Sequence, residues 1–182
     1  MNHTDHVNLL RAGIPARGGV WADFGSGTGA FTLALAELVG PEATLYSVDQ
    51  DQRALTQQQR ALRDHFPTVN VHYLNADFTR PLDLPPLDGL VMANSLHFHR
   101  HKAPILQRVR DYLKPAGRLL LVEYNTDHGN TWVPYPLSYP AWETLARETG
   151  FVETRKLAAR PSRFLDEIYS AMSIRPADRG SP

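Results

Sequence analysis

The clearest chemical feature of the chain is a glycine-rich turn that follows an acidic residue. Asp23 stands two positions before Gly25, and Gly27 and Gly29 follow at alternate positions. Glycines allow a backbone to approach a ligand closely, and the free N–H groups at the start of a helix receive polar or anionic atoms. The glycine spacing also fits a loose dinucleotide fingerprint, so the glycines alone do not distinguish a nicotinamide cofactor from another adenosine-containing one. An anion at Asp23 repels a pyrophosphate and attracts an ammonium group, which favours a cofactor that carries an amino acid.

Two further carboxylates follow predicted strands. Asp49 ends the strand expected over 44–48, twenty positions after the last glycine of the turn, where it can accept both hydroxyls of a ribose. Asp77 follows the strand expected over 69–74, where it can accept from an adenine amino group beside the apolar wall of Phe78. The alternatives are a solvated acid at the end of a strand for Asp49 and an ordinary turn aspartate for Asp77.

An alternation of strands and helices must bring these side chains together. Short apolar runs predict strands over 20–24, 44–48, 69–74, 87–93 and 118–124, with two final strands over 151–157 and 164–173. Helical spacing of apolar residues predicts helices over 29–39, 51–64, 105–113 and 142–149. The prolines between 79 and 86 predict a loop instead of a crossover helix. The pattern predicts an α/β fold with a parallel sheet, helices on both faces, and ligands at the carboxyl ends of the strands.

Four stretches of the chain together carry a resemblance to a known family. They are VWADFGSGTG at 20–29, YSVD at 46–49, NADF at 75–78 and LKPAGRLLLVE at 113–123. In order and spacing they resemble the class I S-adenosylmethionine-dependent methyltransferases, over nearly the whole chain from about Val20 to Ser173. The resemblance implies a Rossmann-like, doubly wound sheet of seven strands, mostly parallel with an antiparallel last strand.

The same resemblance implies S-adenosylmethionine as the cofactor. Asp23 and the glycines would then hold the methionine portion, Asp49 the ribose and Asp77 the adenine. The expected cofactor-binding residues are Asp23, Gly25, Ser26, Gly27, Gly29, Asp49, Gln50, Asp77, Phe78 and Asn94.

The segment MANSLHF at 92–98 leaves the fourth predicted strand where the reactive methyl group should point. It resembles small-molecule methyltransferases with an Asn and a His in this loop, and it lacks the Asn-Pro-Pro-Tyr signature of enzymes that methylate base or glutamine amide nitrogens. His97 is the candidate general base for a hydroxyl or an acidic carbon. The alternative is that His97 only packs under the cofactor, because displacement at a sulfonium does not require a base.

Aromatic residues after the fifth predicted strand are the candidates for an acceptor pocket. Tyr124, Trp132 and Tyr135 can line such a pocket or clamp a cationic nitrogen, and the alternative is that they pack a proline-rich loop. At the start of the chain, His3 and His6 can fold over the cofactor as a short lid, although the pattern favours a frayed terminus.

Composition limits the classes of function. The 182 residues are 42% hydrophobic and 21% charged, which predicts one domain over 1–174, with a disordered tail over 175–182. The absence of cysteine excludes thiol nucleophiles and thiolate metal sites, and the alternating His97, His99 and His101 lack a nearby carboxylate, so no metal site is predicted.

Charge and hydropathy also limit the partners. The 19 basic and 19 acidic side chains balance, which argues against nucleic acid as the substrate. No apolar run is long enough for a membrane span or a secretory signal, and we expect a cytoplasmic protein.

We therefore expect an S-adenosylmethionine-dependent methyltransferase that acts on an oxygen, nitrogen or carbon atom of a small-molecule acceptor. One alternative is a nicotinamide-dependent oxidoreductase, against which Asp23 argues. The other is a non-catalytic S-adenosylmethionine-binding module that works with a partner chain. The sequence leaves homodimerisation open.

Overall fold

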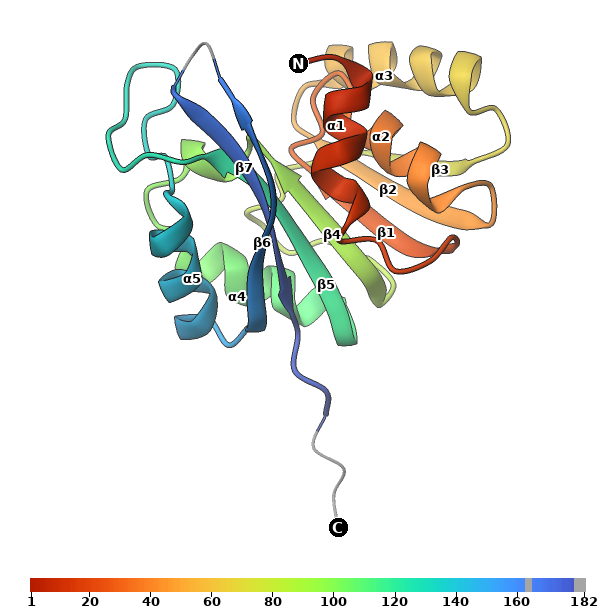
Figure 1. The fold of residues 1–182 in the computed structure, drawn as a ribbon. Coiled ribbons are helices and arrows are strands. Elements are labelled where there is room, and N and C mark those ends of the chain that lie inside the picture. Colours follow the sequence, from red (N-terminus) through yellow and green to blue (C-terminus); the bar gives the residue numbers. More distant parts are fainter. Residues whose placement is uncertain (163–164, 179–182) are drawn as a thin grey trace.

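The computed structural model describes residues 1–162 and 165–178, which form one seven-stranded sheet with helices on both faces (Figure 1). The strands are β1 (Gly19–Phe24), β2 (Ala43–Asp49), β3 (Asn70–Asn75), β4 (Leu87–Ala93), β5 (Leu113–Tyr124), β6 (Val152–Pro161) and β7 (Glu167–Ile174). The helices are α1 (His3–Arg11), α2 (Ala30–Val39), α3 (Gln52–His65), a short 3-10 helix η1 (Leu96–Phe98), α4 (Ala103–Tyr112) and α5 (Tyr139–Glu148).

The strand order is β3-β2-β1-β4-β5-β7-β6. All pairings from β3 to β5 are parallel, whereas β7 pairs antiparallel with both β5 and β6. The order reverses between β1 and β4, and open sheets of this kind bind ligands at the carboxyl ends of the strands beside such a reversal. The predicted fold class, including the antiparallel last strand, is confirmed.

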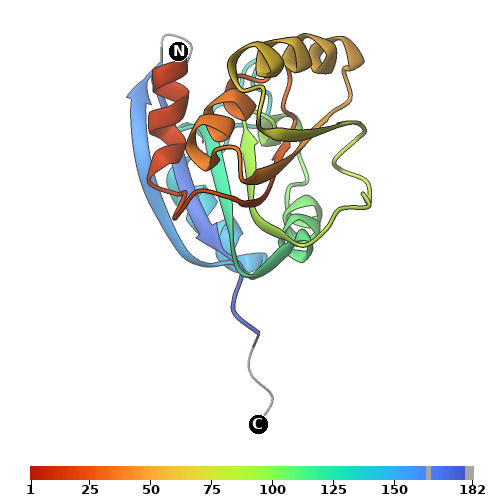
Figure 2. The ribbon, with the colours of Figure 1, turned by 90° about the vertical axis from the view of Figure 1, so that its right-hand side faces the viewer.

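The helices form two layers because each buries one apolar stripe against the sheet. On one face, Leu10 of α1 and Leu35 of α2 pack with sheet residues in a single buried cluster. On the other face, Leu106 of α4 and Trp142 of α5 belong to a second cluster. Figure 2 shows the start of α1 at one end of the sheet and the C-terminal tail at the other.

The start of the chain differs from the favoured expectation of a frayed terminus. Residues His3–Arg11 form α1, because the Asn2 side chain accepts from the Asp5 backbone N–H and the Asp5 carboxylate accepts from the Asn2 N–H in a capping box. The helix also buries Val7, Leu9 and Leu10 completely or nearly so. The short polar sequence around His3 and His6 does not predict this burial. The burial of the apolar face explains why the segment is a helix and not a frayed terminus.

Other boundaries shift modestly. The predicted loop over 79–86 is confirmed, since β3 leads to β4 without a helix among these described residues. β6 extends past the predicted end at Leu157 to Pro161, and Phe164, the predicted start of the last strand, lies outside the described residues. In the predicted tail, the Arg175 backbone exchanges hydrogen bonds with Ala116 and Gly117, while 179–182 lie outside the described residues.

Within the part of the chain that the structure describes, no helix has both the length and the apolar character needed to cross a membrane. The cytoplasmic location stays a prediction.

Candidate active site

The glycine turn joins β1 to α2 at the carboxyl edge of the sheet. The backbone N–H groups of Gly25 and Ser26 both donate to the Val48 carbonyl, at 2.9 and 3.1 Å, which fixes the turn to β2. Gly25 has φ +73°, and a Cβ there would lie 2.4 Å from the Cβ of Ser95. A side chain at Gly25 would therefore close the gap between the turn and the end of β4.

Asp49 ends β2 and holds the same turn. Its Oδ2 accepts from the Gly27 N–H at 2.7 Å, and its Oδ1 accepts from the Asp51 N–H at 2.8 Å. Each carboxylate oxygen keeps a second lone pair for a further donor. Gln50 follows and is fixed by its backbone carbonyl, which accepts from Asn75 Nδ2 at 2.8 Å.

Asp23 lies at the end of β1 and is 2% exposed. Its Oδ2 accepts from the Thr32 hydroxyl at 2.6 Å. Burial raises the pKa of the Asp23 carboxyl to about 7, the nearby Asp49 charge raises it further, and the Thr32 hydrogen bond opposes the rise. A cation beside Asp23 would stabilise the ionised carboxylate, as expected of a group that receives an ammonium.

Two adjoining cavities open at this edge and share Gly25, Asp49, Asn94 and Phe98. The first, here called the Phe78 cavity, has a volume of about 250 Å³ and is also lined by Gln50, Phe78, Ser95 and His99. The second, here called the Asp23 cavity, has a volume of about 390 Å³ and is also lined by Met1, His6, Asp23, Ser26, Gly27, Thr28, Ala30, Phe31 and Ala93. Together they form one elongated site with an aromatic end and an acidic end.

The two cavities offer unpartnered polar atoms and an open stretch of the glycine turn to a ligand. Among the described residues, Asn94 Oδ1 and Ser95 Oγ are buried without a hydrogen-bond partner, and both residues line the Phe78 cavity. Buried polar atoms of this kind are usually paired, so they indicate a polar ligand. A Cβ at Gly27 would have nothing within 4 Å, which leaves the turn open to a ligand.

The structure does not bring Asp77 into this lining. Its Oδ1 accepts from the Thr79 N–H at 2.9 Å and from the Thr79 hydroxyl at 2.6 Å, and that hydroxyl lowers the pKa of the Asp77 carboxyl. Phe78 does line its cavity, where its ring stacks on Phe24 at 5.8 Å and meets the edge of His99 at 5.2 Å. The adenine contact of Asp77 stays a prediction, since its Oδ1 is engaged in a local turn.

His97 is buried, 3% exposed, and pairs with a carboxylate that is completely buried. Glu123 Oε2 lies 2.9 Å from His97 Nδ1, and Glu123 Oε1 accepts from the His97 backbone N–H at 3.1 Å. When the Glu123 carboxylate accepts this hydrogen bond, His97 donates from Nδ1, and Nε2 of the neutral ring can accept. The His97 ring lies 4.3 Å from the ring of Phe98 and 5.9 Å from that of Tyr124.

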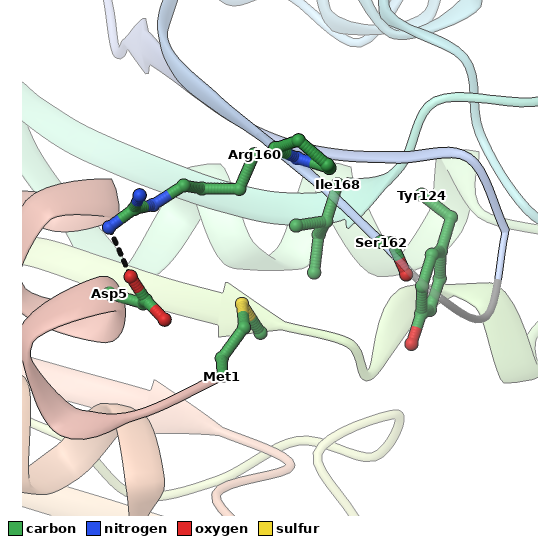
Figure 3. Close-up of a pocket in the computed structure, with 7 residues that line it drawn as sticks. Met1, Asp5, Tyr124, Arg160, Ser162 and Ile168 are labelled. Carbon is green, nitrogen blue, oxygen red and sulfur yellow. Dashed lines mark hydrogen bonds and ion pairs between the residues drawn. The ribbon is translucent and has the colours of Figure 1, made fainter.

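A third cavity, here called the Arg160 cavity, lies where the start of the chain meets the ends of β5, β6 and β7 (Figure 3). It has a volume of about 640 Å³ and is lined by Met1, Asp5, Tyr124, Arg160, Pro161, Ser162 and Ile168. Asp5 of α1 and Arg160 of β6, both in its lining, form an ion pair. Met1 lines both this cavity and the Asp23 cavity. His97 lines neither of them, but its ring contacts are Phe98, which lines the Asp23 cavity, and Tyr124, which lines the Arg160 cavity.

The predicted acceptor residues separate in the structure. Tyr124 lines the Arg160 cavity, whereas Trp132 is 73% exposed and Tyr135 is 41% exposed, and neither is among the residues that line it. Tyr135 packs against Lys102, whose Nζ lies 5.8 Å from the ring centroid. Roles for Trp132 and Tyr135 in acceptor binding stay predictions.

The alternating histidines take different partners: His97 pairs with Glu123, and His99 packs on Phe78. Within the described residues, no three histidine or acidic side chains gather as a metal-binding group.

Sequence reasoning missed several residues of the site. The sequence predicts Glu123 only as part of a strand. An acid within an apolar strand is nevertheless a signal of function, because buried acids are rare unless they are paired. Arg160 and Asp5 come from opposite ends of the chain, and no local pattern links them. His6, considered as part of a lid, does line the Asp23 cavity and packs on Phe31 at 4.7 Å.

Comparisons with known proteins agree with this geometry. A family model described as a methyltransferase domain matches residues 17–153. Acetylserotonin O-methyltransferase of Mus musculus is 36% identical over 115 residues, which cover 57% of this chain and 28% of that protein. The ubiquinone/menaquinone biosynthesis C-methyltransferase UbiE of Proteus mirabilis is 31% identical over 105 residues, which cover 57% of this chain and 41% of that protein.

Among solved structures, the CurJ carbon methyltransferase superposes with a TM-score of 0.73 at 21% identity, covering 90% of this chain and 50% of that one. This likeness shows the shared fold. The chain spans less than half the length of each of the two curated relatives. Because the family model covers most of the chain, the chain belongs to the methyltransferase-domain family, as a class I S-adenosylmethionine-dependent methyltransferase domain.

Proposed function

We propose that this protein transfers the methyl group of S-adenosylmethionine to a nucleophilic carbon or oxygen atom of a small-molecule acceptor, with His97 as the general base. The observation that carries the proposal is the buried pair of His97 and Glu123, at 2.9 Å, whose imidazole lies near the rings of Phe98 in the cofactor cavities and Tyr124 in the Arg160 cavity.

The residues of the two adjoining cavities would hold the cofactor. Asp23 would receive the ammonium group, Asp49 the ribose hydroxyls, and Phe78 would provide an apolar face for the adenine. Asn94 Oδ1, buried and without a partner among the described residues, would accept a hydrogen bond from the same ligand. When bound, the cofactor supplies an electrophilic methyl group on a sulfonium.

The His97–Glu123 pair favours acceptors that lose a proton on methylation. Glu123 holds the ring with Nδ1 protonated, so Nε2 can take a proton from a hydroxyl or an acidic C–H. An uncharged amine attacks a sulfonium without prior deprotonation, so a fixed base adds less for that class. Among the expected oxygen, nitrogen and carbon acceptors, the pair therefore favours oxygen and carbon.

The Arg160 cavity supports a small acceptor. Its volume of about 640 Å³ falls in the range of small-molecule sites, roughly 300–1,000 Å³. Tyr124 and Ile168 give it apolar walls, and the Asp5–Arg160 pair gives it one polar end.

The first test is isothermal titration with S-adenosylmethionine, S-adenosylhomocysteine, NADH and NADPH. We expect binding of the two sulfur compounds alone, with micromolar affinity. Binding of a nicotinamide instead would support the oxidoreductase alternative. It would also mean that Asp23 does not contact the bound ligand.

The second test is transfer of labelled methyl to acetylacetone, 2-naphthol and benzylamine as acceptor probes. His97→Gln should reduce transfer to the first two by about 10²- to 10⁴-fold with S-adenosylhomocysteine affinity unchanged. His101→Gln, the same change at an exposed histidine, is the matched control. Cofactor binding without transfer to any probe would favour the non-catalytic module.

A further inference from the structure

We infer that Gln58 of α3 is a positioning residue for the cofactor, which ties the Asp23 carboxylate and the glycine turn together through one buried chain of hydrogen bonds. The inference rests on the proposed function, because it takes Asp23 and the turn as cofactor contacts. Gln58 lies in a run of three glutamines, Gln57 to Gln59, on a largely polar helix. Gln58 is completely buried, whereas Gln57 and Gln59 are exposed.

The chain of hydrogen bonds has a defined direction. Ser47 Oγ donates its single proton to Gln58 Oε1 at 2.7 Å, so Ser26 must be the donor in its 2.8 Å bond to Ser47. On the other side, Gln58 Nε2 donates to Thr32 Oγ1, whose single proton goes to Asp23 Oδ2. Asp23 is therefore the terminal acceptor on one side, and Ser26 of the glycine turn is the terminal donor on the other.

An amide completes this chain. Its carbonyl accepts from Ser47 while its amino group donates to Thr32, and it does both at every pH, whereas a glutamic acid of the same length could do so only while protonated. All five linked side chains are at most 8% exposed. A buried hydroxyl left without its partner carries a desolvation penalty, so the loss of Gln58 would disturb both ends of the chain.

Packing gives independent support. Gly29 caps α2 with φ +93°, and a Cβ there would lie 2.3 Å from Gln58 Cγ. The Gln58 side chain thus lies directly beneath the turn where α2 begins. The glycine at this position makes room for Gln58, a different role from the ligand approach that the sequence suggests for Gly29.

The charged groups that share the Asp23 cavity explain why Asp23 needs this support. Asp49 from β2 is an anion that disfavours ionisation of Asp23, and His6 from α1 has its pKa lowered by burial, so it provides little positive charge. The Thr32 hydrogen bond is the protein contact that lowers the pKa of Asp23, and Gln58 holds Thr32 in that orientation.

The experiment compares the wild-type protein with Gln58→Leu, Gln58→Glu and the exposed control Gln57→Leu. In the free proteins, ¹³C NMR follows the titration of the Asp23 carboxyl between pH 5 and 9. Isothermal titration at pH 7 then measures the affinity for S-adenosylhomocysteine and for 5′-methylthioadenosine, which lacks the amino acid. Gln58→Glu keeps the size of the side chain and the acceptor for Ser47, and in its ionised form it has no donor for Thr32.

Both Gln58 variants should raise the Asp23 titration midpoint by about one pH unit, so that the ionised fraction of Asp23 falls and S-adenosylhomocysteine binds about fivefold more weakly at pH 7. Affinity for 5′-methylthioadenosine should change by less than about threefold, and Gln57→Leu should match the wild type. An unchanged Asp23 midpoint in the folded Gln58→Glu variant would overturn the inference, as would an equal loss for both ligands. If the wild type binds neither ligand, the proposed function fails, and the NMR titration still decides the role of Gln58.

Discussion

At the scale of single residues, the site is organised by acids with different surroundings. Asp23 is buried with one hydroxyl partner, whereas Asp49 accepts two backbone N–H groups, and Asp77 is held by its own turn. These differences separate their chemical roles, since an acid with few partners gains most from a bound cation and an acid with fixed partners positions the backbone.

Asp49→Ala should weaken binding of S-adenosylhomocysteine by roughly 1.5 to 3 kcal/mol, because two charge-assisted hydrogen bonds to the ribose are lost. The same change frees the Gly27 N–H that Asp49 holds in the turn. Asp51→Ala is the control: it removes the N-cap of α3, at a cost of about 1 kcal/mol in folding stability, without touching the cavities. Isothermal titration measures the affinities. Equal affinities for Asp49→Ala and the wild type would mean that Asp49, at the end of β2, does not bind the ribose.

Asp23→Asn should change how stability depends on pH. The folded-state pKa of about 7 lies above the ordinary value of 3.8, so the wild type loses stability as pH rises between these values, by about 4 kcal/mol in all. The loss is complete above about pH 7. Relative to the wild type, the free Asp23→Asn protein should therefore gain stability from pH 4 to 7 and show a constant difference above it. Urea denaturation at each pH measures the difference, and a difference independent of pH would contradict the burial of an ionisable group here.

At the scale of elements, the turn from β1 to α2 shows which features a sequence pattern reveals. The turn was predicted because glycines, acid and helix start are neighbours in the chain. The His97–Glu123 pair was not, because it depends on the pairing of β4 with β5, where Ala93 lies opposite Val122. The formation of α1 also depends on contacts with residues distant in the sequence, since its buried leucines pack on α2 and the sheet.

Two alanine substitutions in this turn should differ in cost. Gly25→Ala should lower the free energy of unfolding by about 2 to 4 kcal/mol, because φ is +73° and the new Cβ would meet Ser95 Cβ at 2.4 Å. Gly27→Ala has φ +53° and open space around its Cβ, so it should cost only about 1 kcal/mol. Chemical denaturation of both variants is the measurement, and a larger loss for Gly27→Ala would mean that the two positions are packed differently from the structure.

At the scale of the whole molecule, the order of predicted strands and helices was enough for the fold class, since the helix-linked strands favour a parallel sheet with right-handed crossovers. The cavities could not be predicted from the sequence. The Arg160 cavity combines α1, the end of β5 and the β6–β7 pair, and its lining contains an ion pair between Asp5 and Arg160. Local periodicity indicates which face of each element is buried but not which distant side chains meet at its end.

Ligand binding should be visible in the stability of the whole chain, because the cofactor cavities draw on β1, β2, β4 and the turns that follow them. S-adenosylhomocysteine at 100 times its dissociation constant should stabilise the folded state by about 2.7 kcal/mol. For a chain of this length that corresponds to a rise in Tm of about 5 to 10 °C. Differential scanning calorimetry with S-adenosylhomocysteine, and with NADH as the control, provides the measurement. A rise with NADH and none with S-adenosylhomocysteine would mean that the glycine turn receives a pyrophosphate despite the buried anion at Asp23, and the assignment of the methionine end would have to be abandoned.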